Sequence, residues 1–216
     1  MKIENLTVSY PDKRVFENFN VDINGGEITC VLGPSGVGKT TLLNAISGVI
    51  ESDIEKVSAS YVFQEPNLVN AITVYDNLKL VCDDGDKIIN ALDTVGLLDK
   101  KTCYPETLSG GEKQRVNLAR AILYGGDIWL LDEPFSSLDI KLKLELYNLF
   151  VSLWEKDKKP CVFVTHDIDE ALIFAGRIVV LDGSKITLDI KIEKAYPRKL
   201  EELAKERNIL FSALTN

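Results

Sequence analysis

The 216-residue sequence predicts an α/β fold with a mainly parallel central sheet. Short apolar runs alternate along the chain with segments whose apolar residues have helical spacing. A glycine-rich turn joins one of these runs directly to a helix-like segment. Residues 65–107 break the alternation with helix-like segments and turn residues. We therefore expect a sheet covered by helices on both faces, with a helical lobe inserted over residues 65–107.

The chain opens with two β-like runs, residues 3–10 and 15–23, on either side of the turn PDKR. The apolar positions of the second run favour a strand with one buried face: Phe16, Phe19, Val21 and Ile23. Two such runs close together along the chain predict an antiparallel sheet.

The later apolar runs predict the strands of the parallel sheet. They are residues 28–33, 61–64, 127–134, 161–166 and 177–183. Helical spacing predicts helices at residues 40–50, 111–124, 140–156 and 167–176, and a final helix with a frayed end at 196–216. Residues 187–216 contain no motif, so packing against the core is their expected role.

Composition restricts the function classes. Apolar residues make up 45 % and charged residues 27 %, as in ordinary soluble domains. The net charge of −8 and a pI near 4.8 argue against a nucleic-acid partner. No apolar stretch approaches the roughly 20 residues of a membrane-spanning helix. Of the four cysteines, Cys30 and Cys161 lie in strand-like runs, where a buried apolar role is expected and not a metal or disulfide.

Residues 33–40, GPSGVGKT, match the phosphate-binding pattern GxxxxGK[ST] between a strand and a helix. Glycines let the backbone curl so that successive N–H groups face a phosphate, and the helix N-terminus adds partial positive charge. Lys39 would reach the β- and γ-phosphates, and the Thr40 hydroxyl would bind Mg²⁺.

The run 127–134, DIWLLDEP, supplies the acidic half of such a site. Its apolar residues form a buried strand that brings Asp132 to the carboxyl edge of the sheet, where ligands bind in α/β folds. Asp132 would hold Mg²⁺, and Glu133 would act as general base on the attacking water.

A second phosphate-binding element lies at residues 108–115, LSGGEKQR. Ser109, Gly110 and Gly111 would offer a hydroxyl and backbone amides at the start of a helix near Glu112. One mononucleotide pocket has no room for both elements. We therefore expect the second element of one copy to close over the nucleotide held by another copy.

The ordered set of phosphate loop, LSGGEKQR and LLDEP resembles the ATP-binding cassette (ABC) ATPases, from Tyr10 to about Asp182. The resemblance implies a P-loop NTPase fold of ABC type in a single domain over residues 1–216. Residues 1–64 and 108–216 would form the nucleotide-binding core, and residues 65–107 the helical subdomain. Because only residues 49–60 separate the first helix from the Gln64 strand, the antiparallel β subdomain is expected to be reduced.

The resemblance assigns further roles. Tyr10 falls where an aromatic ring stacks on adenine, and Gln64 where a glutamine contacts Mg²⁺ and the attacking water. SSLD, residues 136–139, matches the loop that crosses the dimer interface, with Asp139 positioning the partner's phosphate loop. His166, the one histidine, matches the residue that bonds the γ-phosphate and orients Glu133.

These arguments give the expected site of an ATPase with ATP and Mg²⁺ as cofactors. The expected catalytic residues are Glu133, His166 and Lys39. The expected nucleotide contacts are Tyr10, Gly33, Pro34, Ser35, Gly36, Val37, Gly38, Lys39, Thr40, Thr41, Gln64, Ser109, Gly110, Gly111, Glu112, Asp139 and His166. The expected metal ligands are Thr40, Gln64 and Asp132.

Three stretches are similar to the importer branch of the family: DEPFSSLD, HDIDEAL, and VFQEPNL followed by TVYDNL. The last is typical of the nitrate, sulfonate and taurine group and its relatives for thiamine precursors. The resemblance implies a nucleotide-dependent homodimer at the cytoplasmic face of the membrane, bound there through integral membrane permease subunits. A permease helix would dock in a groove formed largely by residues 66–75. An external solute-binding protein is the further expected partner.

The alternative is a soluble or non-transport ABC ATPase. Repair ATPases carry a long coiled coil before LSGG, whereas here only 68 residues, 40–107, lie between Lys39 and Leu108. Translation factors of the superfamily usually carry two cassettes, and this chain has one. Cell-division and lipoprotein-release ATPases usually read DEPTGNLD, which differs from the sequence at residues 132–139.

Overall fold

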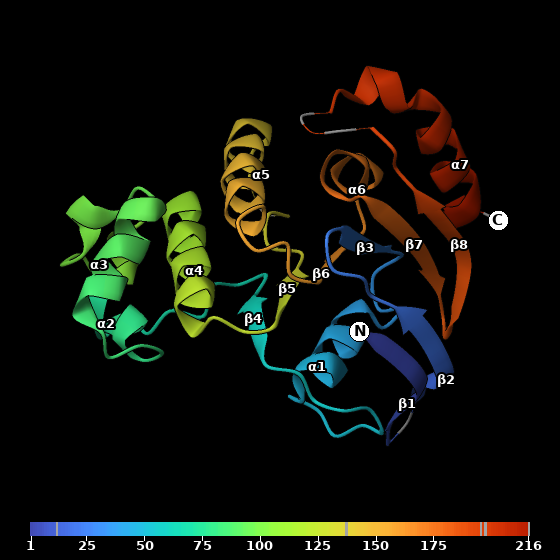
Figure 1. The fold of residues 1–216 in the computed structure, drawn as a ribbon, viewed down its shortest axis with the longest axis horizontal. Coiled ribbons are helices and arrows are strands. Elements are labelled where there is room, and N and C mark those ends of the chain that lie inside the picture. The colour runs from blue at the N-terminus through green and yellow to red at the C-terminus, as the bar shows by residue number, and fades with distance from the viewer. Residues whose placement is uncertain (12, 137, 195, 197, 216) are drawn as a thin grey trace. The chain divides into compact units, whose positions relative to one another are not determined.

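The computed structural model describes residues 1–11, 13–136, 138–194, 196 and 198–215 (Figure 1). The chain forms two compact units. The first contains Met1–Ser58, Asp127–Glu133 and Lys158–Asn216, and the second contains Ala59–Gly126 and Pro134–Asp157. The expected lobe, residues 65–107, lies within the second unit. Asp12 of the predicted turn, Ser137 of the SSLD loop and Asn216 of the frayed end fall outside the described residues.

The first unit begins with the predicted antiparallel pair, β1 (Lys2–Tyr10) and β2 (Lys13–Asp22), which form a two-stranded sheet (Figure 1). The apolar face predicted for the second strand is confirmed, since its four residues are all buried: Phe16, Phe19, Val21 and Ile23.

Two asparagines explain why buried residues in this pair are not always two positions apart. Asn5 and Asn18 have left-handed φ angles of 55° and 50°, which asparagine tolerates better than most residues. The pairing register shifts around both of them. Each is therefore the extra residue of a bulge, so that the next buried residue follows after three positions, at Leu6 after Ile3 and at Phe19 after Phe16.

The central sheet of the first unit contains β3 (Ile28–Leu32), β5 (Ile128–Asp132), β6 (Cys161–Thr165), β7 (Arg177–Asp182) and β8 (Lys185–Lys191). Their order is β5-β6-β3-β7-β8, parallel except for β8, which runs antiparallel to β7. Every residue of β3, β5 and β6 is buried. Cys30 and Cys161 are fully buried free thiols, and burial raises the pKa of both.

The strand β8 was not predicted. Its residues alternate between half-buried and exposed positions, and it lies at the edge of the sheet. An edge strand that buries little leaves only a weak pattern in the sequence.

Three helices of the first unit pack on the sheet. Helix α1 (Lys39–Ser47) contacts β5 and β6, and α6 (Ile168–Phe174) contacts β3 and β6. Helix α7 (Ala204–Thr215) follows the short 3₁₀ helix η3 (Leu200–Leu203) and contacts β7 and β8 (Figure 1). The final helix therefore exists, but it begins eight residues later than predicted from the sequence.

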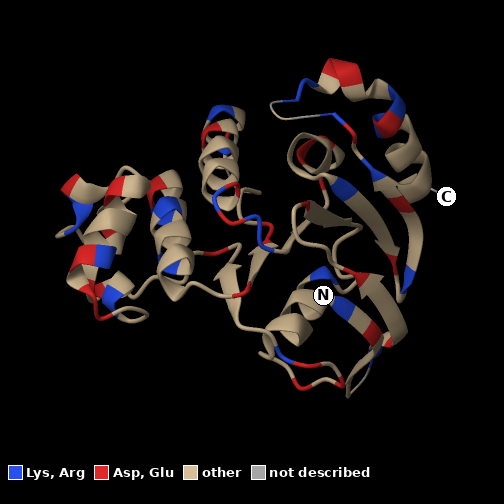
Figure 2. Cartoon of the chain, viewed as in Figure 1, with Lys and Arg blue, Asp and Glu red and all other residues tan. Residues whose placement is uncertain are grey.

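The second unit is largely helical. It contains β4 (Ala59–Val62), α2 (Val74–Lys79), α3 (Gly85–Thr94), α4 (Gly110–Tyr124) and α5 (Ile140–Trp154), with 3₁₀ turns η1 (Leu98–Lys100) and η2 (Pro105–Thr107). Helix α4 is central, since it contacts β4, α2, α3 and α5. Acidic and basic residues are interspersed along the helices of the second unit (Figure 2). Within the described part of the chain, no helix combines the length and apolarity needed to cross a bilayer.

Candidate active site

Three parallel strands of the first unit end at one edge of the sheet. Leu32 of β3 pairs with Thr165 of β6, and Asp132 of β5 pairs with Val164. The residues that follow these strands therefore begin at neighbouring positions. This edge brings the phosphate loop, Glu133 and His166 together, as expected for ligand sites of parallel sheets.

The phosphate loop, residues 33–38, runs from β3 to α1. Gly36 and Gly38 have left-handed φ angles of 78° and 117°. A Cβ atom on Gly38 would lie 2.7 Å from Cγ1 of Val15, so both the backbone angle and the available space require glycine there. Helix α1 begins immediately after Gly38, which directs its N-terminus toward the loop. This is the geometry that binds a phosphate.

Lys39 is the one buried lysine among the described residues, with 5 % of its surface exposed. Its ammonium donates to the carbonyl oxygens of Gly33 (2.9 Å) and Pro34 (3.1 Å) and lies 3.4 Å from Oε1 of Glu133. A buried cation bonded to the loop itself is held where the phosphates of a nucleotide would lie.

Thr40 and Asp132 meet at the start of α1 and the end of β5. The Thr40 hydroxyl donates to Oδ1 of Asp132 over 3.0 Å, and Asp132 is buried. A hydroxyl and a carboxylate are hard oxygen ligands of the kind that Mg²⁺ takes, with phosphate oxygens and waters completing its shell. No cluster of three acidic, cysteine or histidine ligands occurs among the described residues. The pair therefore fits an Mg²⁺ bound together with a nucleotide.

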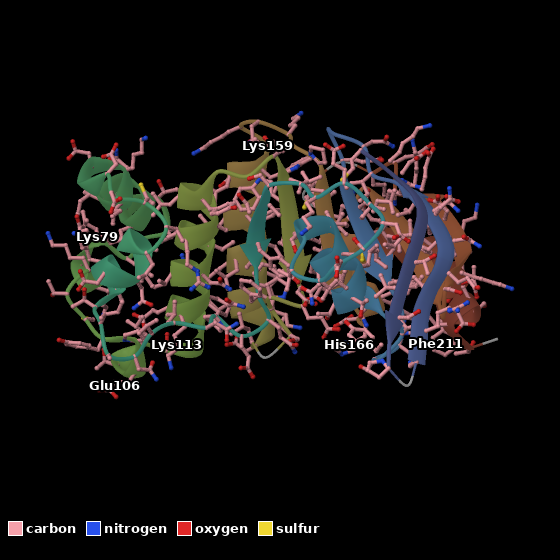
Figure 3. The ribbon with its side chains drawn as sticks, turned by 90° about the horizontal axis from the view of Figure 1, so that it is seen from below. Lys79, Glu106, Lys113, Lys159, His166 and Phe211 are labelled. Atoms are coloured by element: carbon pink, nitrogen blue, oxygen red, sulfur yellow. The ribbon has the colours of Figure 1, made fainter. Side chains whose placement is uncertain are left out.

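The side chains of Glu133 and His166 contact each other at this edge. Oε2 of Glu133 lies 2.9 Å from Nδ1 of His166, whose side chain is 52 % exposed and is labelled in Figure 3. Glu133 has a left-handed φ of 42°, and its amide donates to the carbonyl of Val164 over 3.1 Å. Non-glycine residues rarely adopt this backbone, and such angles cluster at active sites. The angle turns Glu133 away from the strand direction that Asp132 follows.

The first strand pair brings the side chain of Lys13 to the loop and places Tyr10 opposite Lys13. Tyr10, the last residue of β1, is 45 % exposed and pairs with Lys13 of β2. The Lys13 ammonium donates to the carbonyl of Gly36 over 3.3 Å. Lys13 was not predicted from the sequence, because an isolated lysine in an expected turn carries no pattern.

The LSGG element lies in the second unit and begins α4 with a capping box. The Ser109 hydroxyl accepts from the Glu112 amide (3.3 Å), while the Ser109 amide and hydroxyl both donate to Oε2 of Glu112 (2.8 Å each). These bonds from Ser109 lower the pKa of Glu112. Gly111 packs closely on Leu142, so a side chain there would clash.

The two other expected residues of the second unit make local contacts. The Gln64 amide donates to the hydroxyl of Ser136 over 3.3 Å. Asp139 caps α5 by accepting from the amide of Leu142 over 3.2 Å. Gln64 is thus held near the first residue of the SSLD loop, and Asp139 fixes the helix that follows it.

A buried polar row on α4 was missed by the sequence analysis. Gln114 donates to the carbonyls of Phe63 (3.2 Å), Gln64 (3.1 Å) and Pro134. Asn117 donates to the carbonyl of Phe63 and to Oε1 of Gln114, each over 2.9 Å. This row holds the backbone on both sides of the Gln64 side chain. Polar residues three positions apart on an otherwise apolar helix face were the available signal.

Arg120 extends the row by one more turn of the helix. Its guanidinium donates to the carbonyls of Pro66 and Asn67 (2.6 and 3.2 Å) and to Oδ1 of Asn117 (3.0 Å). Burial lowers the pKa of Arg120. The segment after Gln64 is therefore tied to α4 as well.

Known proteins resemble the chain in both sequence and fold. The pattern of the ABC transporter family matches residues 16–136. An aliphatic sulfonates import ATP-binding protein of Paracoccus denitrificans is 38 % identical, over 91 % of this chain and 85 % of its own length. Another, from Streptomyces avermitilis, is 35 % identical over 99 % of this chain and 90 % of its own length.

Two solved structures share the fold. One is cbiO1 of Clostridium perfringens, part of an ABC transporter complex, with a TM-score of 0.79, 25 % identity and coverage of 97 % of this chain and 92 % of that one. The other is a putative metal-chelate type ABC transporter in an inward-facing conformation, with a TM-score of 0.78, 28 % identity and coverage of 88 % and 82 %.

The chain belongs to the ABC transporter family, and within a transporter it is the ATP-hydrolysing component. The family and the fold class expected from the sequence, a P-loop α/β fold with a reduced antiparallel subdomain and a helical lobe, are confirmed.

Proposed function

We propose that the chain is the ATPase subunit of a membrane importer, and that its two units carry separate parts of the nucleotide site. The first unit binds ATP and activates water. The second unit supplies groups that complete the site of another copy, and it docks the permease.

The phosphate loop and Tyr10 hold the nucleotide. Amides of the loop and the N-terminus of α1 receive the phosphates, and the Lys39 ammonium moves from the loop carbonyls to phosphate oxygens. The exposed ring of Tyr10 stacks on the adenine, since every base offers a π-face.

Thr40 and Asp132 would hold Mg²⁺, and Gln64 is the third expected ligand. An ion held there would offset negative charge on the phosphates of the nucleotide. The 3.0 Å hydrogen bond between Thr40 and Asp132 shows that the two oxygens already lie close together.

Glu133 takes the proton from the attacking water as it forms a bond to the γ-phosphorus. His166, 2.9 Å from the Glu133 carboxylate, keeps that carboxylate oriented and also hydrogen-bonds the γ-phosphate. The two contacts together need a proton on each ring nitrogen, because carboxylate and phosphate oxygens are both acceptors. The bond between the γ-phosphorus and the oxygen that bridges it to the β-phosphorus breaks, so that ADP leaves and phosphate is formed.

Two copies form a nucleotide-dependent homodimer. Ser109, Gly110 and Gly111 of one copy approach the γ-phosphate held by the other, and Asp139 positions the partner's phosphate loop. Ser109 is bonded to Glu112 in this structure, so a phosphate that binds Ser109 must replace the Glu112 carboxylate as its acceptor.

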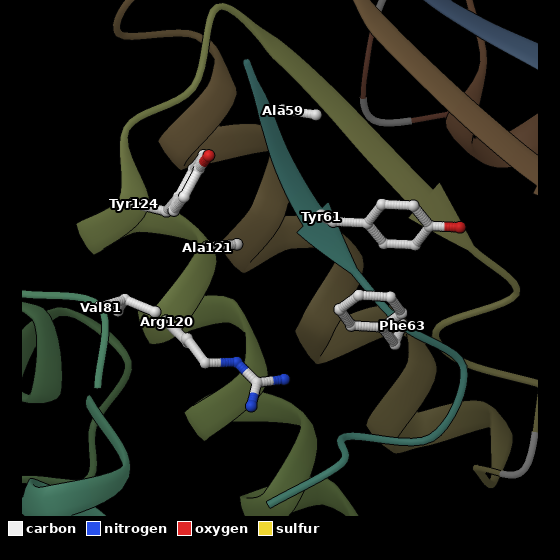
Figure 4. A pocket seen from close by; sticks show the side chains of 7 residues that line it. All are labelled: Ala59, Tyr61, Phe63, Val81, Arg120, Ala121 and Tyr124. Atoms are coloured by element: carbon white, nitrogen blue, oxygen red, sulfur yellow. The ribbon is translucent and has the colours of Figure 1, made fainter. Parts of the chain in front are cut away.

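A pocket in the second unit is suited to the permease (Figure 4). It measures about 190 Å³ and is lined by Ala59, Tyr61, Phe63, Val81, Arg120, Ala121 and Tyr124. The rings of Tyr61 and Phe63 stack with centroids 4.1 Å apart. Such a mainly apolar surface with one cation fits the end of a short helix from a membrane subunit. The groove expected from the sequence at residues 66–75 contributes none of this lining, although Arg120 bonds to Pro66 and Asn67.

The relatives named for aliphatic sulfonate import favour a permease of the nitrate, sulfonate and taurine group, served by an external solute-binding protein. The permease would hold this subunit at the cytoplasmic face of the membrane. The transported solute would be selected by the permease and the binding protein.

The proximity of Glu133, Lys39 and His166 within the first unit is the observation that carries this proposal. Its test is steady-state ATP hydrolysis by the wild-type chain and by Glu133→Gln, with ATP affinity measured in parallel. We expect turnover to fall by about 10²- to 10⁴-fold, as for loss of a general base, with ATP affinity retained.

The exposed Glu106→Gln is the matched control, because it removes a carboxylate from the turn η2 of the second unit. It should leave turnover unchanged. Unaltered hydrolysis by Glu133→Gln would contradict the assigned role of Glu133.

A further inference from the structure

The C-terminal segment, whose sequence carries no motif, packs against the helix that follows His166. Helix α6 begins at Ile168, two residues after His166, and both η3 and α7 contact it. Figure 1 shows α7 beside α6. The segment is therefore in a position to affect the histidine through α6.

One end of α6 is held by Arg207 of α7. Its Nε donates to Oδ1 of Asp169 over 2.6 Å, and its Nη2 donates to Oδ2 over 3.2 Å. Asp169 lies in the first turn of α6, three residues after His166. A two-point contact between a guanidinium and a carboxylate fixes orientation as well as distance.

The other end of α6 is held by Arg198. Its Nη1 donates to the carbonyls of Leu172 (3.1 Å) and Ala175. Leu172 lies in the last turn of α6, and Ala175 is its C-cap. Its Nε donates to the carbonyl of Lys194 (2.6 Å), and its guanidinium lies 4.3 Å from the centre of the Tyr196 ring. A cation that binds terminal carbonyls stabilises the end of a helix.

His166 lies between two residues that are bonded to the first turn of α6. The Thr165 hydroxyl donates to the buried carboxylate of Glu170 and accepts from the amide of Asp167 over 3.1 Å. Asp167 in turn accepts from the amides of Asp169 (2.9 Å) and Glu170 (3.2 Å). A shift of α6 would therefore move the backbone on both sides of His166.

We propose that Arg198 and Arg207 are positioning residues for ATP hydrolysis: they hold the two ends of α6 and so keep His166 against Glu133. The proposal rests on the role of His166 given above. Neither arginine needs to reach the nucleotide, because both act through α6.

Because His166 is the one histidine of the chain, the surroundings of its ring can be measured directly. In the untagged chain, the NMR signals of the imidazole ring report on His166 alone. We expect Arg207→Ala to move these signals and to lower kcat for ATP by about three- to tenfold, while ATP affinity and Tm change little. This loss is smaller than the roughly hundredfold that a misplacement of about 1 Å can cause.

Two further variants separate positioning from simple loss of charge. Exchanging the charges in the double variant Asp169→Arg with Arg207→Asp should restore the ring signals and kcat toward wild type. Glu202→Gln is the matched control, because it removes another ion pair of the same segment, Lys194 with Glu202 at 3.6 Å, that does not involve α6. Glu202→Gln should change neither the ring signals of His166 nor kcat.

The proposal is wrong if Arg207→Ala and Arg198→Met leave both the ring signals and kcat unaltered. It is also wrong if kcat falls only in parallel with Tm while the ring signals stay in place. Since Arg198 is half-buried and its loss can impair folding, the exposed Arg207 provides the decisive variant. Full activity of His166→Ala would instead contradict the catalytic role of His166, and the ring signals would still report whether the two arginines position it.

Discussion

Thr40 and Asp132 lie 92 positions apart in the sequence, yet the Thr40 hydroxyl donates to the Asp132 carboxylate over 3.0 Å. The contact joins the first turn of α1 to the end of β5. Because each residue is fixed by its own element, the two oxygens are held side by side, as the proposed Mg²⁺ site requires.

Thr40→Val tests this pair by replacing the hydroxyl with a methyl group of similar size. We expect the Mg²⁺ concentration for half-maximal ATP hydrolysis to rise at least about tenfold, because one ligand is lost. The measurement is a Mg²⁺ titration of turnover at saturating ATP. Thr94→Val removes a hydroxyl that bonds within α3 and should leave the titration unchanged.

Gly38→Ala tests the phosphate loop. Alanine at a φ of 117°, with its Cβ 2.7 Å from Val15, should distort the loop and weaken ATP binding by more than about tenfold. Equilibrium binding of a fluorescent ATP analogue measures the effect.

Gly183→Ala is its control, since Gly183 also has a left-handed φ, of 56°, but has open space around it. That variant should cost about 1 kcal/mol or more of folding stability and leave ATP affinity intact. Equal loss of affinity in both variants would argue against a specific role for the loop geometry.

Glu112→Gln tests the capping box through its pH dependence. The Ser109 bonds hold the pKa of Glu112 below its ordinary value of 4.5 in the folded chain. The ionised carboxylate therefore stabilises the fold above pH 4.5, and this contribution is lost as the pH falls through the lowered pKa. The variant should be less stable than wild type by a few tenths to about 1 kcal/mol near neutral pH, with the difference vanishing in acid.

Urea unfolding of wild type and variant at about pH 7 and about pH 3.5 measures that difference. Glu106→Gln, an exposed carboxylate of η2, provides the reference for a simple change of charge. A gap that stays constant between the two pH values would rule out ionised Glu112 as its source.

Asn117→Leu tests the polar row on α4. The change leaves the carbonyl of Phe63 and the guanidinium of Arg120 with fewer partners in a buried region. We expect a loss of about 1–3 kcal/mol in the free energy of unfolding. Asn90→Leu, at an exposed position of α3, should change it by less than about 0.5 kcal/mol.

The sequence was sufficient to predict which residues of the first unit gather at one edge of its sheet. Short apolar strands followed by Gly33, Asp132 and His166 predict that these residues gather at one edge, and the register of β3, β5 and β6 brings them there. The argument works because parallel strands share a direction, so residues that follow them emerge on the same side.

Other features left little trace in the sequence. In strand β8 every second residue is only half-buried and the others are exposed. The left-handed φ angles of Asn5 and Asn18 become apparent only from the shifted pairing of β1 and β2. The contacts of Arg198 and Arg207 depend on how the C-terminal segment folds back on α6, which no local pattern encodes.

The measurement that tests the importer account most directly is purification of tagged Glu133→Gln from its own membranes in mild detergent with ATP, followed by identification of the proteins that accompany it. We predict a polytopic permease. Adding Tyr124→Asp, which places a charge at the pocket, should abolish its recovery, while Tyr104→Asp, at a similarly exposed tyrosine outside the pocket, should not. Recovery of ribosomes or DNA-processing proteins, or of no membrane protein, would contradict the account.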